Sequence, residues 1–105
     1  MPPVAAKLVT IITDFATRDT VERELATIGI RAFSVFQVRG HGRHGVIRGG
    51  ILQSENVQFN VVTDAAHATK LLEWAERELV PNFPGIAWVS DVSVVSGSRP
   101  KPKRG

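Results

Sequence analysis

Cysteine and tyrosine are absent from this 105-residue chain. Without cysteine, the chain cannot form a disulfide scaffold, a cysteine zinc site or a catalytic thiol, and it suits a reducing compartment. No apolar run approaches the roughly 20 residues that span a bilayer. The beginning, Met1–Lys7, also lacks the charged-then-apolar order of a signal peptide. These absences predict a cytoplasmic protein.

Acidic residues are missing from two stretches. Residues 38–54 and residues 99–105 contain arginine or lysine but no Asp or Glu. The chain has 13 Lys+Arg against 10 Asp+Glu, a net charge of +3, and four of the positive charges fall in the last seven residues. The remaining body is therefore close to neutral. Two basic segments on a neutral body favour a local anion site over a basic face.

The order of the expected helices and strands predicts the fold class. β-Branched and aromatic residues predict four strands, and apolar residues at helical spacing predict two helices. The expected strands are 7–13, 32–39, 56–63 and 86–95, and the expected helices are 17–28 and 65–80. Two βαβ units in this order give an α+β ferredoxin-like βαββαβ sandwich, with a long loop between the second and third strands.

Both helices carry apolar stripes and end signals. The first stripe contains Val21, Leu25 and Ile28, with Asp19 in the first turn and Gly29 as the expected stop. Asp64 or Thr63 is expected to cap the second helix, and Pro81 marks its end. The second stripe consists of Ala68, Leu71, Leu72, Ala75 and Leu79.

The first two strands are apolar on both faces. Leu8 and Ile12 alternate with Val9 and Ile11, and in the second strand Phe33 and Val35 alternate with Phe36 and Val38. Two helices cover only one face of a four-stranded sheet, so the second face is expected to be covered by association of subunits. Trp74 and Trp88 are expected in the core or between subunits.

The long loop, about 40–55, carries the residue types of an anion site. It contains five glycines, two arginines and two histidines. Glycine lets backbone N–H groups turn toward an oxyanion, and arginine offers a planar fork to phosphate or carboxylate. A loop of this length is usually functional or disordered.

Other interpretations of the loop have less support. Residues 40–45 match G-x-G-x-x-G, but Gly49 and Gly50 exclude the helix that a dinucleotide motif must open. A metal site at His41, His44 and His67 would have no carboxylate in register. Residues 39–42 resemble the start of an RNA-binding signature, without its stacking aromatics and outside the third strand.

Catalytic patterns are also missing. No Ser/His/Asp set or carboxylate pair converges on a strand end, and Asp14 and Asp91 are expected to be solvated charges. The chain is therefore expected to be a binding module and not an enzyme, with no metal.

Residues 38–45, V-R-G-H-G-R-H-G, resemble the V-K-G-x-G-R-x-x-G start of the T-loop in PII signal proteins. The resemblance extends over nearly the whole chain, from the Gly29-Ile30 turn to the closing strand. It implies a homotrimer that binds adenine nucleotides between subunits and moves its T-loop to engage a target. The domain then covers 1–98, with the T-loop at about 40–55 and a basic tail at 99–105.

The resemblance also assigns residues. Gly40, Gly42 and Arg43 match the T-loop base beside the nucleotide phosphates, and Arg99 falls near a phosphate-binding arginine. The matches on the nucleoside side are Ile12, Ser34 and Val62. We further expect Arg48, Lys101 and Lys103 to contact phosphate, bicarbonate or the T-loop.

Departures from the nitrogen-sensing members favour the PII-like branch. His44 stands in place of a glutamine, no tyrosine is available for uridylylation, and residues 82–86 lack the family's lysine. This pattern resembles the carboxysome-associated and bicarbonate-linked PII-like proteins. It implies AMP or ADP as ligand, with ATP and bicarbonate as further candidates. A bicarbonate transporter or a carboxysome component is the implied target.

The competing hypothesis is a small nucleic-acid-binding ferredoxin-like domain that uses the same basic segments. Its affinity would fall steeply with salt. A trimeric metal-tolerance protein of the same fold is disfavoured by the missing cysteines.

Overall fold

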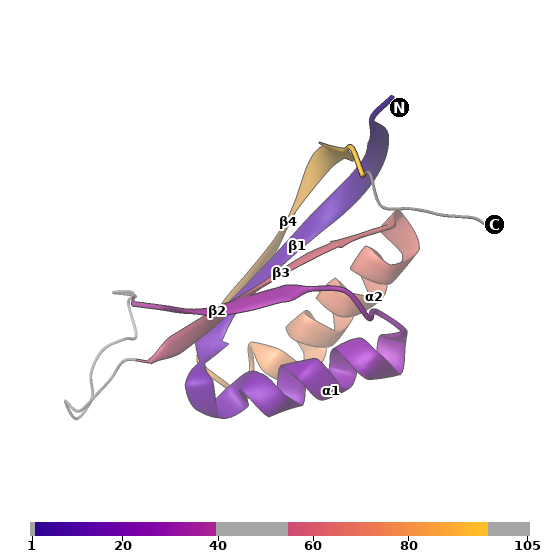
Figure 1. Cartoon of the computed structure of the whole chain (residues 1–105). Helices are drawn as coiled ribbons and strands as arrows, with labels where there is room; N and C mark the ends of the chain where they lie inside the picture. The colour runs from indigo at the N-terminus through magenta and orange to yellow at the C-terminus, as the bar shows by residue number, and fades with distance from the viewer. Residues whose placement is uncertain (1, 40–54, 97–105) are drawn as a thin grey trace.

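The computed structural model describes residues 2–39 and 55–96. Its four strands form one sheet in the order β2-β3-β1-β4, and all neighbouring strands are antiparallel. Both helices cover one face of this sheet (Figure 1). This confirms the α+β ferredoxin-like fold with a loop between β2 and β3. The elements are β1 (Val4–Asp14), η1 (Phe15–Thr17), α1 (Arg18–Ile28), β2 (Ser34–Val38), β3 (Asn56–Thr63), α2 (Ala65–Trp74), η3 (Ala75–Leu79) and β4 (Gly85–Val94).

The hydrophobic core lies between the sheet and the helices. Val9 and Ile11 of β1 pair with Val61 and Phe59 of β3, and all four side chains are fully buried. The helices contribute the predicted stripe residues, of which Ile28 and Leu72 are only partly buried. Trp74, outside the predicted stripe, is also buried in this core.

The helix ends follow local chemistry. Asp64 accepts a hydrogen bond from the backbone N–H of His67 and so caps α2, which confirms Asp64 and not Thr63 as the cap. Gly29 ends α1 with φ of 104°, a left-handed conformation that favours glycine. The second helix, predicted over 65–80, is an α-helix only over Ala65–Trp74, and Ala75–Leu79 form a π-helical turn.

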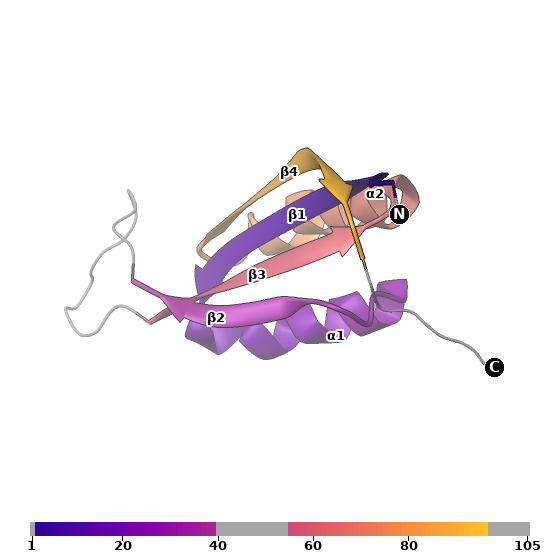
Figure 2. The same ribbon diagram turned by 45° about the horizontal axis from the view of Figure 1, so that its top comes forward.

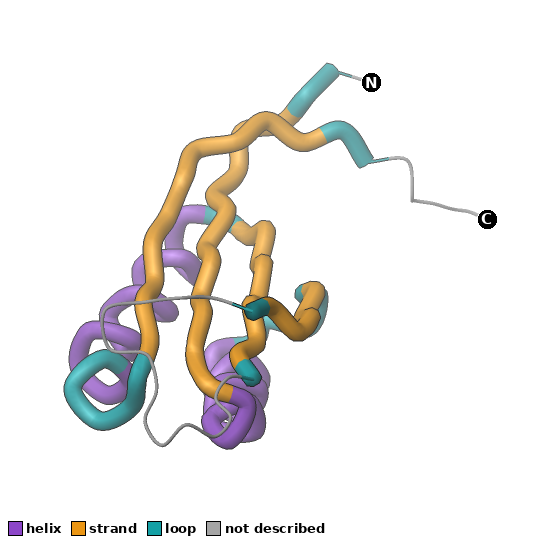
Figure 3. Tube along the Cα trace, turned by 90° about the vertical axis from the view of Figure 1, so that its left-hand side faces the viewer, coloured by secondary structure: helices purple, strands orange, loops and turns teal. Residues whose placement is uncertain are grey.

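The predicted strands differ from the observed ones at their ends. β3 has the predicted bounds, whereas β1 begins three residues earlier than expected and β2 is shorter at both ends. The extension of β1 pairs Val4 with Val94 and Ala6 with Val92 of β4. These paired ends of β1 and β4 project beyond the helices (Figures 1 and 3).

Candidate functional site

The sheet face that points away from the helices, here called the outer face, carries three of the predicted site residues. Side chains alternate along a strand, so the neighbours of the buried residues Val9, Ile11 and Val61 point to this face. Ile12, Ser34 and Val62 occupy such positions on β1, β2 and β3. Figure 2 shows the strands in front of the helices. The fold therefore brings these three residues to one face.

The three residues are spread over the face and do not form a compact cluster. Ser34 pairs with Asn60, Val62 pairs with Leu8, and Leu8 lies four residues before Ile12 on β1. Four residues of strand span about 13 Å. A ligand that reaches Ile12 and Val62 of one copy must therefore extend across the centre of the outer face.

Polar side chains occupy that centre, and sequence reasoning missed them. The hydroxyl of Thr10 donates to Oδ1 of Asn60 at 3.3 Å, and Nε2 of Gln58 donates to the same oxygen at 3.1 Å. Thr10 is only 3% exposed. The sequence of β3 already contains the pattern that reveals this polar centre, since Asn56, Gln58 and Asn60 alternate with core residues. The outer face thus combines an apolar surface with a small hydrogen-bonding centre.

Large apolar side chains surround this centre and are exposed in the single chain. They come from all four strands, and the alternation confirms the prediction of a second apolar face. The exposed members are Val4, Phe36, Val62, Ile86 and Trp88. Trp88 therefore lies on the outer face, whereas Trp74 lies in the core. Several large exposed apolar side chains on one sheet face are typical of an interaction surface.

One end of the sheet is organised by the β1–α1 junction, residues 13–17. The hydroxyl of Thr13 donates to the carbonyl of Pro84 at 2.6 Å, and the backbone N–H of Phe15 donates to the carbonyl of Glu55 at 2.9 Å. Asp14 accepts hydrogen bonds from the backbone N–H and the hydroxyl of Thr17. Asp14, expected as a solvated charge, instead caps η1 because its carboxylate is the nearest acceptor for that turn.

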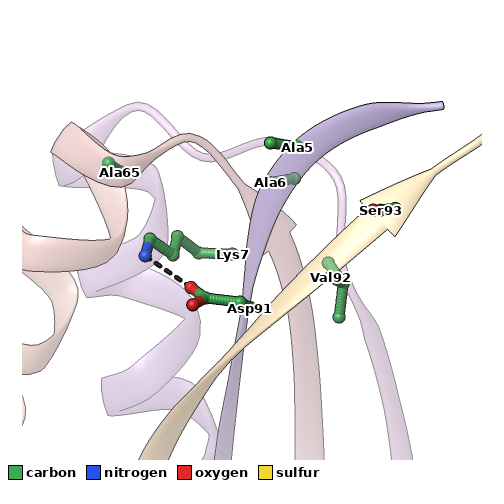
Figure 4. A pocket seen from close by; sticks show the side chains of 7 residues that line it. All are labelled: Ala5, Ala6, Lys7, Ala65, Asp91, Val92 and Ser93. Atoms are coloured by element: carbon green, nitrogen blue, oxygen red, sulfur yellow. Dashed lines mark hydrogen bonds and ion pairs between the residues drawn. The ribbon is translucent and has the colours of Figure 1, made fainter.

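Two open hollows lie at the opposite end, on the projecting strands. The first, of about 490 Å³, lies on the helix side, where Nζ of Lys7 and Oδ1 of Asp91 form an ion pair at 2.6 Å (Figure 4). The side chain of Asp91 is 85% exposed, as expected for a solvated charge. The second hollow, of about 430 Å³, includes Val62 and Ser96. Its size is within the range of small-molecule sites.

His67 belongs to the cap of α2. Its Nδ1 lies 2.9 Å from Oδ1 of Asp64. Hydrogen bonds from the backbone and side chain of His67 lower the pKa of the Asp64 carboxyl. Within 2–39 and 55–96, no three His, Cys, Asp or Glu residues are arranged to hold a metal. His41 and His44 lie outside these residues.

The other predicted contacts lie outside the described residues, together with most of the predicted loop and the whole tail. Val38 and Asn56, which flank that loop, pair with each other at the end of the sheet near Asp14. Ser96, just before the tail, follows β4 at the other end. The predicted contacts concerned are Gly40, Gly42, Arg43, Arg48, Arg99, Lys101 and Lys103.

Comparison with protein families finds one match. Residues 6–101 match the family model described as nitrogen regulatory protein P-II. The comparison with curated proteins finds no matching relative. No helix in the described parts of the chain is long and apolar enough to cross a membrane.

Solved structures with the same fold include PII-like proteins. A chain described as a PII-like signaling protein from Thermus thermophilus is 27% identical, with a TM-score of 0.75 over 90% of this chain and 94% of that one. CPII from Thiomonas intermedia, bound to ADP, AMP and bicarbonate, is 19% identical, with a TM-score of 0.75 over 94% and 99%. CPII bound to ADP, AMP and acetate is 16% identical, with a TM-score of 0.77 over 91% and 94%.

Proposed function

Because the chain belongs to the nitrogen regulatory protein P-II family, we propose that it is a homotrimeric PII-like signalling protein that binds AMP or ADP between its subunits. Proteins of this family are non-enzymatic signalling proteins, in agreement with the expectation of a binding module. The family match over residues 6–101 carries the proposal. The geometry of the outer face and of the sheet ends supports it.

The exposed apolar side chains of the outer face support subunit association. Val62 is 49% exposed and Ile86 is 55% exposed in the single chain. Water contact with so many large apolar groups is unfavourable, and a second copy of the same face would remove it. A trimer, the assembly of the family, provides that cover.

The sheet length supports a site shared by two copies. Asp14 lies at one end of β1 and pairs with Asn56, which also pairs with Val38. Val4, ten residues earlier on β1, lies at the other end and pairs with Val94. Ten strand residues span about 33 Å. Val94 at the end of β4 and the residues Val38 and Asn56 that flank the loop therefore lie at opposite ends of one sheet. We propose that one nucleotide contacts Arg43 of one copy and Arg99 of another.

The nucleoside is proposed to lie on the outer face. Ile12 and Val62 offer apolar surface to a purine, and Ser34 offers a hydroxyl across from Asn60. The side-chain oxygen of Asn60 already accepts from Thr10 and Gln58, so its NH₂ group is the part that remains to donate to a ligand. The phosphates would be held by the amides of Gly40 and Gly42, by Arg43 and by Arg99.

We propose that the protein takes part in the regulation of inorganic carbon. CPII, which shares the fold, has been solved with ADP, AMP and bicarbonate. We propose that bicarbonate joins the nucleotide here, with Arg48, Lys101 and Lys103 as anion contacts, and that ATP is a further ligand. Ligand binding would order the 40–55 loop and so regulate a bicarbonate transporter or a carboxysome component in the cytoplasm.

Calorimetric titration tests the proposal. The wild-type chain is titrated with AMP, ADP and ATP, each with and without bicarbonate. A charge-assisted hydrogen bond contributes about 1.5–3 kcal/mol, so Arg43→Ala is expected to weaken ADP binding by at least about tenfold. The melting temperature should not change. Unchanged affinity contradicts the role of Arg43. Absence of adenylate binding, together with salt-sensitive RNA binding, favours a nucleic-acid-binding domain instead.

A further inference from the structure

The β1–α1 junction, residues 13–17, connects the starts of two strands that are distant in the sequence. The backbone N–H of Phe15 donates to the carbonyl of Glu55, the residue before β3. The hydroxyl of Thr13 donates to the carbonyl of Pro84, the residue before β4. Only one residue separates Thr13 from Phe15. The starts of β3 and β4 are therefore hydrogen-bonded to the same short segment.

Thr13 is suited to this contact by burial and by its partner. It is 2% exposed, and a buried hydroxyl needs a hydrogen-bond partner, which the carbonyl of Pro84 provides. Gly85 makes the close approach possible. A Cβ at Gly85 would lie 3.0 Å from the carbonyl oxygen of Ile12 and 3.3 Å from Oγ1 of Thr13. Any side chain there would push the start of β4 away from β1.

The α2–β4 loop, residues 81–84, is anchored on its other side by the end of the helix. The backbone N–H groups of Asn82 and Phe83 both donate to the carbonyl of Leu79, and Nδ2 of Asn82 donates to the carbonyl of Glu78. Among the described residues, Thr13 provides the only side-chain hydrogen bond between this loop and β1. The loop is thus held by the helix end and by one threonine.

We propose that Thr13 is a positioning residue for the nucleotide site, acting through the α2–β4 loop without touching the ligand. Ile86, two residues after Pro84, pairs with Ile12, which is assigned to the nucleoside side. Thr13 fixes this pair at the end of the sheet where Val38 and Asn56 flank the 40–55 segment. The inference rests on the proposed function, because it assigns Ile12 to that site.

Three variants test it. Thr13→Val keeps the shape and removes the hydroxyl, Thr13→Ser keeps the hydroxyl, and the control Thr27→Val removes a hydroxyl that donates to the backbone carbonyl of Arg23 on α1. We expect Thr13→Val to raise amide hydrogen exchange at Asn82, Phe83 and residues 85–87 and to weaken ADP binding about tenfold, the order expected for one lost hydrogen bond to a buried group. Thr13→Ser and Thr27→Val should match wild type in both measurements.

A second variant that displaces the same loop provides the test if Thr13→Val folds poorly. Gly85→Ala leaves the hydroxyl in place and displaces the start of β4, so it should raise the same exchange and weaken ADP binding. Unchanged exchange in both variants overturns the positioning role. Faster exchange with unchanged ADP affinity also overturns it, since Thr13 would then only stabilise the loop. If the wild type binds no adenylate, the proposed function fails. The role of Thr13 at a nucleotide site then fails with it, whereas ADP binding by the wild type leaves the decision to the variants.

Discussion

Ile86→Glu is the most direct test of whether the outer face is covered by other copies. Ile86 is 55% exposed in the single chain, so a charge there meets solvent and should change the stability of an isolated domain by no more than about 0.5 kcal/mol. In an assembly the same position is expected to be buried. The substitution therefore separates a single chain from a trimer.

The magnitude follows from the exposed fraction. Full burial of an isoleucine side chain contributes about 1.5–3 kcal/mol, and roughly half remains to be gained where 55% of the residue is exposed. That is about 1 kcal/mol or slightly more per copy, and about 3–4 kcal/mol per trimer. Burial of a glutamate charge without a partner adds a further cost. The trimer dissociation constant should therefore rise by at least about 100-fold.

Sedimentation velocity over a dilution series measures this effect directly. Wild type is expected at three times the chain mass of 11.4 kDa, and Ile86→Glu at the mass of one chain. Val80→Glu is the matched control, since Val80 is an apolar residue that is 50% exposed at the end of the helix layer. It should remain trimeric. A wild-type monomer, or an Ile86→Glu trimer of wild-type stability, would refute the reasoning.

Two further predictions concern the fold. Gly29→Ala should lower the free energy of unfolding by about 1–2 kcal/mol, because φ at this residue is 104°. Chemical denaturation measures this free energy, and an unchanged value would contradict the role of the left-handed cap. The pKa of Asp64 is lowered from 3.8 by its hydrogen bonds to His67, so its contribution to stability is complete above that value and disappears as the pH falls through the folded-state pKa. The melting temperatures of wild type and Asp64→Asn should therefore differ at neutral pH and converge in acid. A difference that persists in acid would contradict the assignment.

Local patterns predicted the parts of the fold that depend on neighbouring residues. The bounds of β3 were predicted because core and polar residues alternate from Asn56 to Val61 and β-branched residues complete the run, and Gly29 and Asp64 were recognised by their local roles. The first three residues of β1 were missed because their pairing with Val92–Val94 depends on residues far along the chain. The π-helical turn at Ala75–Leu79 has no separate apolar period to reveal it.

The candidate site was predictable only in part. Alternation placed Ile12 and Val9 on opposite faces of the sheet, and the resemblance to PII proteins identified Ile12, Ser34 and Val62 as site residues. The contact between Thr13 and Pro84 joins residues 71 positions apart, so no sequence window could contain it. The hydrogen bonds of Asn60 depend on the register of β1 against β3. Residues that act through long-range contacts were therefore the ones missed.

The outer face has two proposed uses, and its composition explains how both can be served. Its apolar residues favour contact between copies, whereas the hydrogen-bonded centre at Thr10, Gln58 and Asn60 would be costly to bury without partners. A nucleotide between copies would supply donors and acceptors to that centre while its base covers apolar surface. Assembly and ligand binding would then stabilise each other, because a ligand held by two copies binds the trimer and not the separate chains. The polar positions on β3 thus suit an interface in which a polar guest takes part.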